Sequence, residues 1–208
     1  MVPSSGKPQE RGVRSSAKIL DAAEQLMAAR GYAATTISAI CKDTGLPPTS
    51  IYHHFGNKQQ LLAAVMERGA QRWFAALPAW DGVTTDVDDQ VLTAADAVAG
   101  NPLFLRLFYM LSLDSETDSA AAELVGTVRA TAYHCFEGIL TEILLRDYSP
   151  DTARRISARL APFAVALSDG CFFSLQLDAG RADIRQTYLD LVTAVRAMAP
   201  TIAKSLGA

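Results

Sequence analysis

Hydrophobic residues recur at intervals of three and four along almost the whole 208-residue chain, and this spacing limits the possible folds more than any other feature. It is the period of an α-helix with one buried face, and no stretch keeps the period of two that a half-buried strand requires. Glycines, prolines and hydroxyl residues divide the pattern into segments with cap signals at their ends. We therefore predict an all-α protein of about nine helices, three of them within the first 55 residues.

The N-terminal helices are short and closely punctuated. Gly31 is suited to the position after the first helix, because glycine tolerates a left-handed backbone there. Thr35 or Thr36 can cap the second helix, which we expect to end at Gly45. The third is predicted over 48–55. Asn57 with Gln60, then Thr84 or Thr85, Asn101-Pro102, Ser115 or Thr117, Ser149-Pro150 and Asp183 are expected to open the later helices, the last ending near Ala199.

The charge is divided unequally along the chain. Residues 1–58 hold seven Lys or Arg against four Asp or Glu, a balance of +3, and residues 59–208 hold 12 against 18, a balance of −6. A basic head on an acidic body suits binding to a polyanion, because phosphate contacts dominate nucleic-acid affinity. We predict a flexible tail over 1–13, a DNA-binding domain over 14–58 and a larger domain over 59–208.

Other sites and compartments find little support in the residues. The three cysteines (Cys41, Cys135 and Cys171) are isolated, which favours reduced thiols over zinc ligands or disulfides. The N-terminal tail lacks the apolar run of a signal peptide, and no window reaches the ~18 uninterrupted apolar residues of a membrane span. We expect a cytoplasmic protein with no metal, no cofactor and no membrane partner.

Residues 35–58 have the order of a helix-turn-helix, in which the second helix enters the major groove of DNA. The spacing of Leu46, Ile51 and Phe55 directs them inward, toward the preceding helices. The opposite side of the 48–55 helix carries polar residues whose hydroxyls and rings suit phosphates and base edges. Lys58 follows in the first turn of the next helix, beside free backbone N–H groups, where an ammonium is suited to phosphate binding.

The segment TTISAICKDTGLPPTSIYHHFGNKQQLLAAVME, residues 35–67, resembles the DNA-binding region of the TetR family of bacterial transcriptional regulators. The shared elements are the threonine pair, Ile-x-x-Ile, the Gly-Leu turn, Ile-Tyr-x-His-Phe and the Asn-Lys start of the fourth helix. The resemblance covers about residues 15–67, and beyond it only length and helix order agree. It implies a homodimer that binds a palindromic operator in double-stranded DNA, through Thr36, Pro48, Thr49, Ser50, Tyr52, His53 and Lys58.

Pro47 departs from the family pattern, which usually has a Ser or Thr cap at this position. Proline offers no side-chain oxygen, at a cost of about 1 kcal/mol of lost capping. A residue before proline is nevertheless held in the extended region that a cap adopts, so Pro48 should still define where the helix begins. Pro48 also removes a positive charge that is frequent at the helix tip, which affects the choice of bases rather than DNA binding itself.

The two adjacent histidines invite an enzymatic interpretation that their spacing opposes. Neighbouring residues on a helix point ~100° apart, so His53 and His54 cannot hold one metal ion as an i, i+4 pair could. No acidic residue completes a catalytic set nearby, and we predict no catalytic residue. His53 is expected to face DNA and His54 to pack near the helix end. His134 stands alone, with packing and a hydrogen bond in a pocket as its alternatives.

The body offers two further predictions. The helix over 102–113 is apolar nearly all round, so it either fills a solid core or lines a cavity. The aromatic and apolar candidates for an effector pocket are Trp73, Phe74, Phe104, Phe108, Leu111, Tyr133, Phe136 and Phe172. Pro162 is expected to kink its helix. Family resemblance places a dimer interface on the last two helices, with Leu167, Leu191, Val192, Val195 and Met198 as candidates.

Taken together, these features predict a ligand-responsive DNA-binding regulator, a repressor released from its operator by a small hydrophobic effector. An activator of the same family would share every feature named above. An α-helical ligand carrier or enzyme is the alternative from another class. It would use the aromatic cavity, but the sequence contains no nucleophile–base pair, phosphate-binding loop or metal set to support it.

Overall fold

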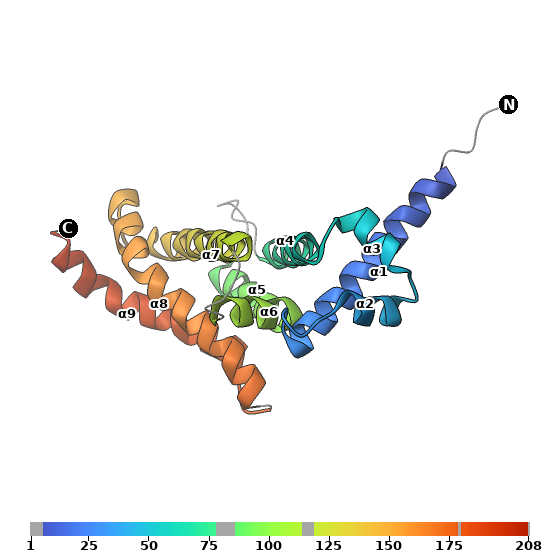
Figure 1. Cartoon of the computed structure of the whole chain (residues 1–208). Helices are drawn as coiled ribbons and strands as arrows, with labels where there is room; N and C mark the ends of the chain where they lie inside the picture. The colour runs from blue at the N-terminus through green and yellow to red at the C-terminus, as the bar shows by residue number, and fades with distance from the viewer. Residues whose placement is uncertain (1–5, 78–85, 114–118, 179, 208) are drawn as a thin grey trace. The chain divides into compact units, whose positions relative to one another are not determined.

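The computed structural model describes residues 6–77, 86–113, 119–178 and 180–207, and within these ranges the chain forms nine α-helices and no strand (Figure 1). The all-α prediction is therefore confirmed. The helices are α1 (Gly6–Arg30), α2 (Ile37–Thr44), α3 (Pro48–Phe55), α4 (Lys58–Ala76), α5 (Val87–Gly100), α6 (Pro102–Leu113), α7 (Ser119–Leu144), α8 (Pro150–Leu177) and α9 (Ile184–Ser205).

The helices group into two compact units. The first contains α1, α2, α3, α4 as far as Gln71, most of α6 and the start of α7. The second contains the last residues of α4 together with α5, the rest of α7, α8 and α9. The predicted boundary at residue 58 falls inside the first unit. α4 is thus one continuous helix whose two ends belong to different units.

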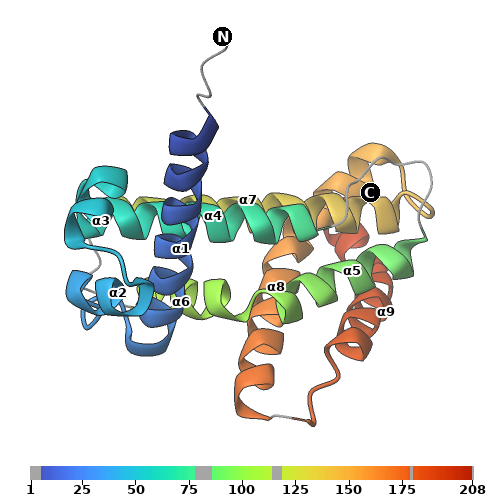
Figure 2. The same cartoon turned by 90° about the vertical axis from the view of Figure 1, so that its right-hand side faces the viewer.

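In the first unit, α1 packs against both α2 and α3, which also contact each other (Figure 2). Ile19, Ile40 and Ile51, one from each of these helices, are fully buried, as their helical spacing predicts. Thr36 caps α2 by accepting a hydrogen bond from the Ala39 amide at 3.1 Å. Its neighbour Thr35 is instead buried, and its hydroxyl donates to the Gly31 carbonyl at 2.8 Å. The sequence had left the cap open between these two threonines.

In the second unit, α9 packs along α5 and α8, and α8 also contacts α5. Ser149 caps α8 through the Thr152 amide, with Pro150 in the first turn, as predicted. Asp183 likewise caps α9 by accepting from the Gln186 amide at 2.9 Å. These two caps show that short polar residues before an apolar run are a sufficient start signal here.

Several helix boundaries differ from the predictions, and some predicted caps lie outside the described residues. α1 already begins at Gly6, inside the tail expected over 1–13, because this segment is rich in the strong helix formers Lys, Gln, Glu and Arg. α5 is capped by Asp86, whereas Thr84 and Thr85 lie outside the described residues, as do Ser115 and Thr117. α9 continues through Pro200 to Ser205, because the proline is exposed while Ile202 and Ala203 are buried and anchor the final turn. In contrast, α8 runs through Pro162 as one helix, and the kink expected there stays a prediction.

Candidate DNA-binding surface and effector cavity

α3 is held in the first unit by one side and exposed on the other. Ile51 is fully buried, and Leu46 and Phe55 at its flanks are half-buried. Gly45 makes the turn into this helix with φ of 67°, a left-handed conformation that favours glycine. Pro47 has the extended backbone of a cap without a side-chain hydrogen bond, and α3 begins at Pro48, as expected. The prolines therefore determine the start of α3 by backbone restriction alone.

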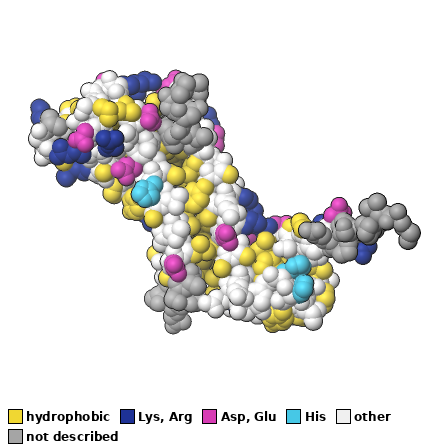
Figure 3. Space-filling view, turned by 90° about the horizontal axis from the view of Figure 1, so that it is seen from above, with side chains coloured by type: hydrophobic (Ala, Val, Ile, Leu, Met, Phe, Trp, Pro, Cys, Tyr) yellow, Lys and Arg dark blue, Asp and Glu magenta, His cyan; other side chains and the backbone are white. Residues whose placement is uncertain are grey.

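The outward side of α3 carries the residues predicted to contact DNA. Pro48, Thr49 and His53 are exposed, Ser50 is half-buried, and half of the Tyr52 surface (51%) is exposed. Histidine side chains reach the molecular surface in the space-filling view (Figure 3). A tyrosine this exposed is unusual, because aromatic rings bury large apolar areas when they can. This surface is therefore available to a partner.

The two histidines differ in their surroundings. Their ring centroids lie 5.5 Å apart with the rings tilted edge to face, and His54 is half-buried. Within the described residues, no group of three or more His, Cys, Asp or Glu side chains is arranged to hold a metal ion. His134 is exposed on α7, which favours neither of the alternatives considered for it.

Lys58 has a defined position in the first turn of α4. Its ammonium donates a hydrogen bond to the Ala33 carbonyl at 3.2 Å and lies 4.3 Å from the centroid of the Tyr32 ring. Partial burial lowers the pKa of Lys58 below its ordinary value. The lysine thus ties the start of α4 to the loop between α1 and α2. The spacing of 25 residues between Lys58 and Ala33 gives no sequence signal for this contact.

A second bridge joins α4 to α1. The two terminal nitrogens of Arg68 bind different carboxylates, one on Asp21 at 2.8 Å and one on Glu24 at 3.0 Å. Asp21 is exposed, but only 5% of the Glu24 side chain is exposed. Burying a carboxylate costs free energy unless a cation is paired with it. Arg68 therefore supplies the charge that lets Glu24 sit between the helices of the first unit.

The second unit encloses a small apolar cavity of about 10 Å³, room for roughly one water molecule. Of the predicted pocket residues, Trp73 and Phe136 line this cavity. Phe104, Phe108 and Leu111 are buried in the first unit, and Phe172 is buried without lining the cavity. Phe74 and Tyr133 are half-buried. The remaining lining residues are Leu77, Ala94, Val98, Ala132, Cys135, Ile139, Ser168 and Tyr188.

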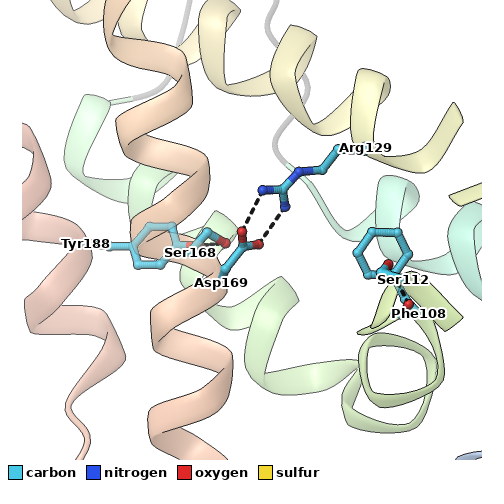
Figure 4. A network of polar contacts seen from close by, with 6 residues as sticks. All are labelled: Phe108, Ser112, Arg129, Ser168, Asp169 and Tyr188. Atoms are coloured by element: carbon cyan, nitrogen blue, oxygen red, sulfur yellow. Dashed lines mark hydrogen bonds and ion pairs between the residues drawn. The ribbon is translucent and has the colours of Figure 1, made fainter. Parts of the chain in front are cut away.

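Sequence reasoning missed the polar groups at this cavity. Tyr188 on α9 donates a hydrogen bond to the Ser168 hydroxyl on α8 at 2.8 Å, and both residues are buried (Figure 4). The next residue, Asp169, accepts two hydrogen bonds from Arg129 on α7, at 2.8 and 2.7 Å. These bonds raise the pKa of Arg129 above its ordinary value. The two pairs link α7, α8 and α9, and nothing in the helical periodicity indicates which polar residues meet.

Tyr188 should make stability sensitive to alkaline pH. Burial raises the pKa of its hydroxyl above the ordinary value of about 10, and the bond with Ser168 opposes this in part. The folded protein therefore keeps a proton that the unfolded chain loses above about pH 10. The contribution is fully present below that pH and declines as the pH rises above it. Denaturant unfolding at pH 9 and 11 should show a smaller loss of stability for Tyr188→Phe than for the wild type, and equal losses would contradict this.

The architecture defines an all-helical protein with a helix-turn-helix unit at its N-terminal end. Residues 19–65 match the family model described as bacterial regulatory proteins, tetR family. The transcriptional regulator UidR of Escherichia coli is 33% identical over 58 residues, 28% of this chain and 30% of that protein. AlkX of Mycobacterium tuberculosis is 28% identical over 146 residues, 69% of this chain and 59% of that protein. These matches place the N-terminal region of the chain, residues 19–65, in the TetR family of bacterial regulatory proteins.

Solved structures share the fold over most of the chain. A transcriptional regulator from Saccharomonospora viridis, solved in complex with choline, has a TM-score of 0.69 at 16% identity and covers 89% of this chain and 95% of its own. GusR of Salmonella enterica has a TM-score of 0.66 at 19% identity, over 88% and 95%. The matched segments of UidR and AlkX span less than two thirds of those proteins.

Proposed function

We propose that the protein is a homodimeric regulator that binds a palindromic DNA operator through α3 and acts as a repressor, released by a small hydrophobic effector. The observation that supports this most is the division of α3 between a buried Ile51 and an exposed Thr49, Tyr52 and His53. A core residue fixes the helix while polar rings and hydroxyls remain available. This is what a helix needs in order to read a major groove.

The remaining predicted contacts fit the same surface. Exposed Thr36 begins α2, where it can reach a phosphate together with the amides of the helix N-terminus. The Pro48 ring and the Thr49 methyl suit the methyl group of thymine. Because α3 carries no Lys or Arg, base preference should depend on hydrogen bonds, methyl contacts and DNA shape. Lys58 provides a cation for the backbone.

A dimer is required because one short helix reads too few base pairs, whereas two related by a two-fold axis read a palindrome. We infer that the partner binds to the α8–α9 outer face, defined by Phe163, Phe173, Leu177 and Met198, which are exposed large apolar residues. The first three lie with Ala166 and Gly170 at spacings of three and four along one side of α8. Small residues between bulky ones allow a second copy to interlock with the first.

The dimer-interface residues predicted from the sequence differ from one another in exposure. Leu191, Val192 and Val195 are buried within the single chain, whereas Leu167 is half-buried and Met198 is partly exposed. An open groove of about 690 Å³ runs beside the α8–α9 outer face, lined by Ala166 and Gly170 of α8 and by Ile184 and Thr187 of α9.

α8 also has the length and mean hydropathy to cross a membrane, but core helices of soluble proteins pass the same test. Apolar residues on both its buried side and its partner side account for that hydropathy.

Disrupting the α8–α9 outer face should separate the protomers. Phe173→Asp places a charge on each side of a two-fold interface and should weaken dimerisation by roughly a hundredfold or more. Leu113→Asp is the matched control, because Leu113 on α6 is also exposed, at 80%, and lies on another helix. Sedimentation velocity over a concentration series measures both. A Phe173→Asp variant as dimeric as the control would contradict this interface.

The effector is proposed to act at the cavity of the second unit. Its lining is apolar apart from a few groups such as the Ser168–Tyr188 pair, so a hydrophobic molecule with one hydrogen-bonding group fits best. Because the cavity holds only about one water, an effector must stabilise a more open state, and it shifts the equilibrium only if it binds the two states differently. Trp73 and Leu77 at the end of α4 line the cavity, so opening it would displace the helix that begins beside the DNA-binding surface.

Selection of bound duplexes from a random DNA pool tests the proposed function. The wild-type protein should enrich a two-fold symmetric sequence with half-sites about one helical turn apart. Enrichment of no sequence, with binding that remains nonspecific, would contradict the proposal. Mass spectrometry of small molecules that co-purify with the protein, followed by their addition to the selected complex, tests the effector. A repressor requires that the bound molecule lower operator affinity, whereas an activator binds DNA as well or better with it.

A further inference from the structure

Lys58 is held from two sides before any DNA is present. The Ala33 carbonyl accepts one hydrogen bond from its ammonium, at 3.2 Å, and the face of the Tyr32 ring lies 4.3 Å away at its centroid. Lysine side chains on a protein surface normally sample many rotamers, and ordering them costs free energy when they bind. Here the ammonium is held by two contacts with the loop between α1 and α2.

Hydrogen bonds within the loop between α1 and α2 hold its backbone, so the loop can support the lysine. Gly31 begins it with φ of 85° and donates its amide to the Met27 carbonyl at 2.8 Å. The buried Thr35 closes it with a hydroxyl bond to Gly31 and an amide bond to the Tyr32 carbonyl at 3.2 Å. Tyr32 is half-buried between these two turns. The backbone of Tyr32 is therefore held by the loop, and the electron-rich face of its ring is turned toward the lysine.

We propose that Tyr32 is a positioning residue for DNA binding, because its ring holds the Lys58 ammonium in place for a backbone phosphate. This inference rests on the proposed function, in which Lys58 contacts DNA, and adds to it a residue that itself touches no nucleotide. An ammonium has three N–H donors. Ala33 accepts one and the ring face receives another, which leaves a third for a phosphate oxygen. DNA thus meets a lysine that is already ordered.

The competing explanation is that Tyr32 and Lys58 only stabilise the junction between the α1–α2 loop and α4. Both explanations predict weaker DNA binding when Tyr32 is changed, so affinity of one variant does not separate them. The two explanations are separated by whether the effect of changing Tyr32 depends on the presence of Lys58. A positioning residue acts only through Lys58, whereas a structural residue affects DNA binding whether or not Lys58 is present.

A double-mutant cycle on the full-length protein and its selected operator duplex provides the test. Lys58→Met should weaken binding and reduce the slope of log K against log salt by about 0.9 for each Lys58 in the complex. Tyr32→Leu should weaken binding about fivefold, and Tyr32→Phe, which keeps the ring, should bind within about twofold of the wild type. In the Lys58→Met background, Tyr32→Leu should produce no further loss. A second cycle with Tyr32→Met uses a side chain of another shape at the same position. Thermal melts identify any variant that is not folded.

The outcomes separate the inference from the proposed function. If Tyr32→Leu weakens binding as much without Lys58 as with it, the positioning role is wrong while the phosphate contact stands. Equal loss in Tyr32→Phe would assign the effect to the hydroxyl and would also overturn the inference. If Lys58→Met leaves both affinity and salt slope unchanged, the proposed contact of Lys58 with DNA fails first.

Discussion

Replacing Arg68 with methionine is expected to lower the free energy of unfolding by about 3 to 5 kcal/mol, because it removes the guanidinium that neutralises the buried Glu24 carboxylate. Methionine keeps most of the apolar contact of the arginine stem, so the loss reports the charge rather than packing. Urea or guanidinium unfolding near neutral pH measures it. The buried pair joins α1 to α4, and so the effect should appear in the unfolding of the first unit.

Two further variants serve as controls for Arg68→Met. Asp21→Asn removes the exposed partner of the same arginine and should cost little, since solvent screens exposed ion pairs. Glu24→Gln combined with Arg68→Met removes both buried charges and should recover much of the stability lost in Arg68→Met alone. If Arg68→Met is within about 0.5 kcal/mol of the wild type, Glu24 does not depend on this arginine.

Gly69→Ala is expected to destabilise the protein although alanine favours a helix by about 1 kcal/mol over glycine. A Cβ atom on Gly69 in α4 would lie 2.4 Å from Cδ2 and 2.9 Å from Cγ of Phe104 on α6. Phe104 is 1% exposed, so its ring cannot move aside without disturbing the core of the first unit. Overpacking of this kind should exceed the helix gain and leave a net loss of about 1 to 3 kcal/mol.

Gly126→Ala is the matched control for this prediction. Gly126 lies inside α7, is exposed, and has no heavy atom within 4 Å of an added Cβ. It should therefore gain up to about 1 kcal/mol from helix propensity, opposite in sign to Gly69→Ala. Phe104→Leu in the Gly69→Ala background should recover part of the loss by making room. Stabilisation by Gly69→Ala itself, measured by denaturant unfolding, would show that α4 and α6 are less closely packed than described.

Much of the fold could be predicted because its signals are local. Thr36, Ser149 and Asp183 cap helices where the sequence indicated a cap, and Gly45 takes the left-handed conformation that its turn requires. Caps of this kind depend on residues two or three positions apart. The predicted end of α9 near Ala199 was wrong, because burial of the residues that follow Pro200 overrides the local effect of the proline.

The candidate site was predictable only in part, because only some of its features depend on residues close together in the sequence. The spacing along α3 separates buried Ile51 from exposed Tyr52, and a single helix suffices to show this. In contrast, Lys58 contacts Tyr32 in the α1–α2 loop, and Arg68 contacts Glu24 on α1, and no periodicity specifies how α4 lies against these segments. The predicted effector pocket stays a prediction: Trp73 and Phe136 line the cavity of the second unit, whereas Phe104, Phe108 and Leu111 belong to the first unit.

The central claim is that the outward side of α3 reads DNA, and the affinity of Tyr52→Ala for the selected operator tests it most directly. Tyr52 is half exposed, so its removal should leave folding and dimerisation unchanged, as a thermal melt and sedimentation can verify. Fluorescence anisotropy at fixed salt should then show operator affinity reduced by at least about tenfold, with nonspecific DNA binding affected much less. A folded, dimeric Tyr52→Ala that binds the operator as tightly as the wild type would contradict the account.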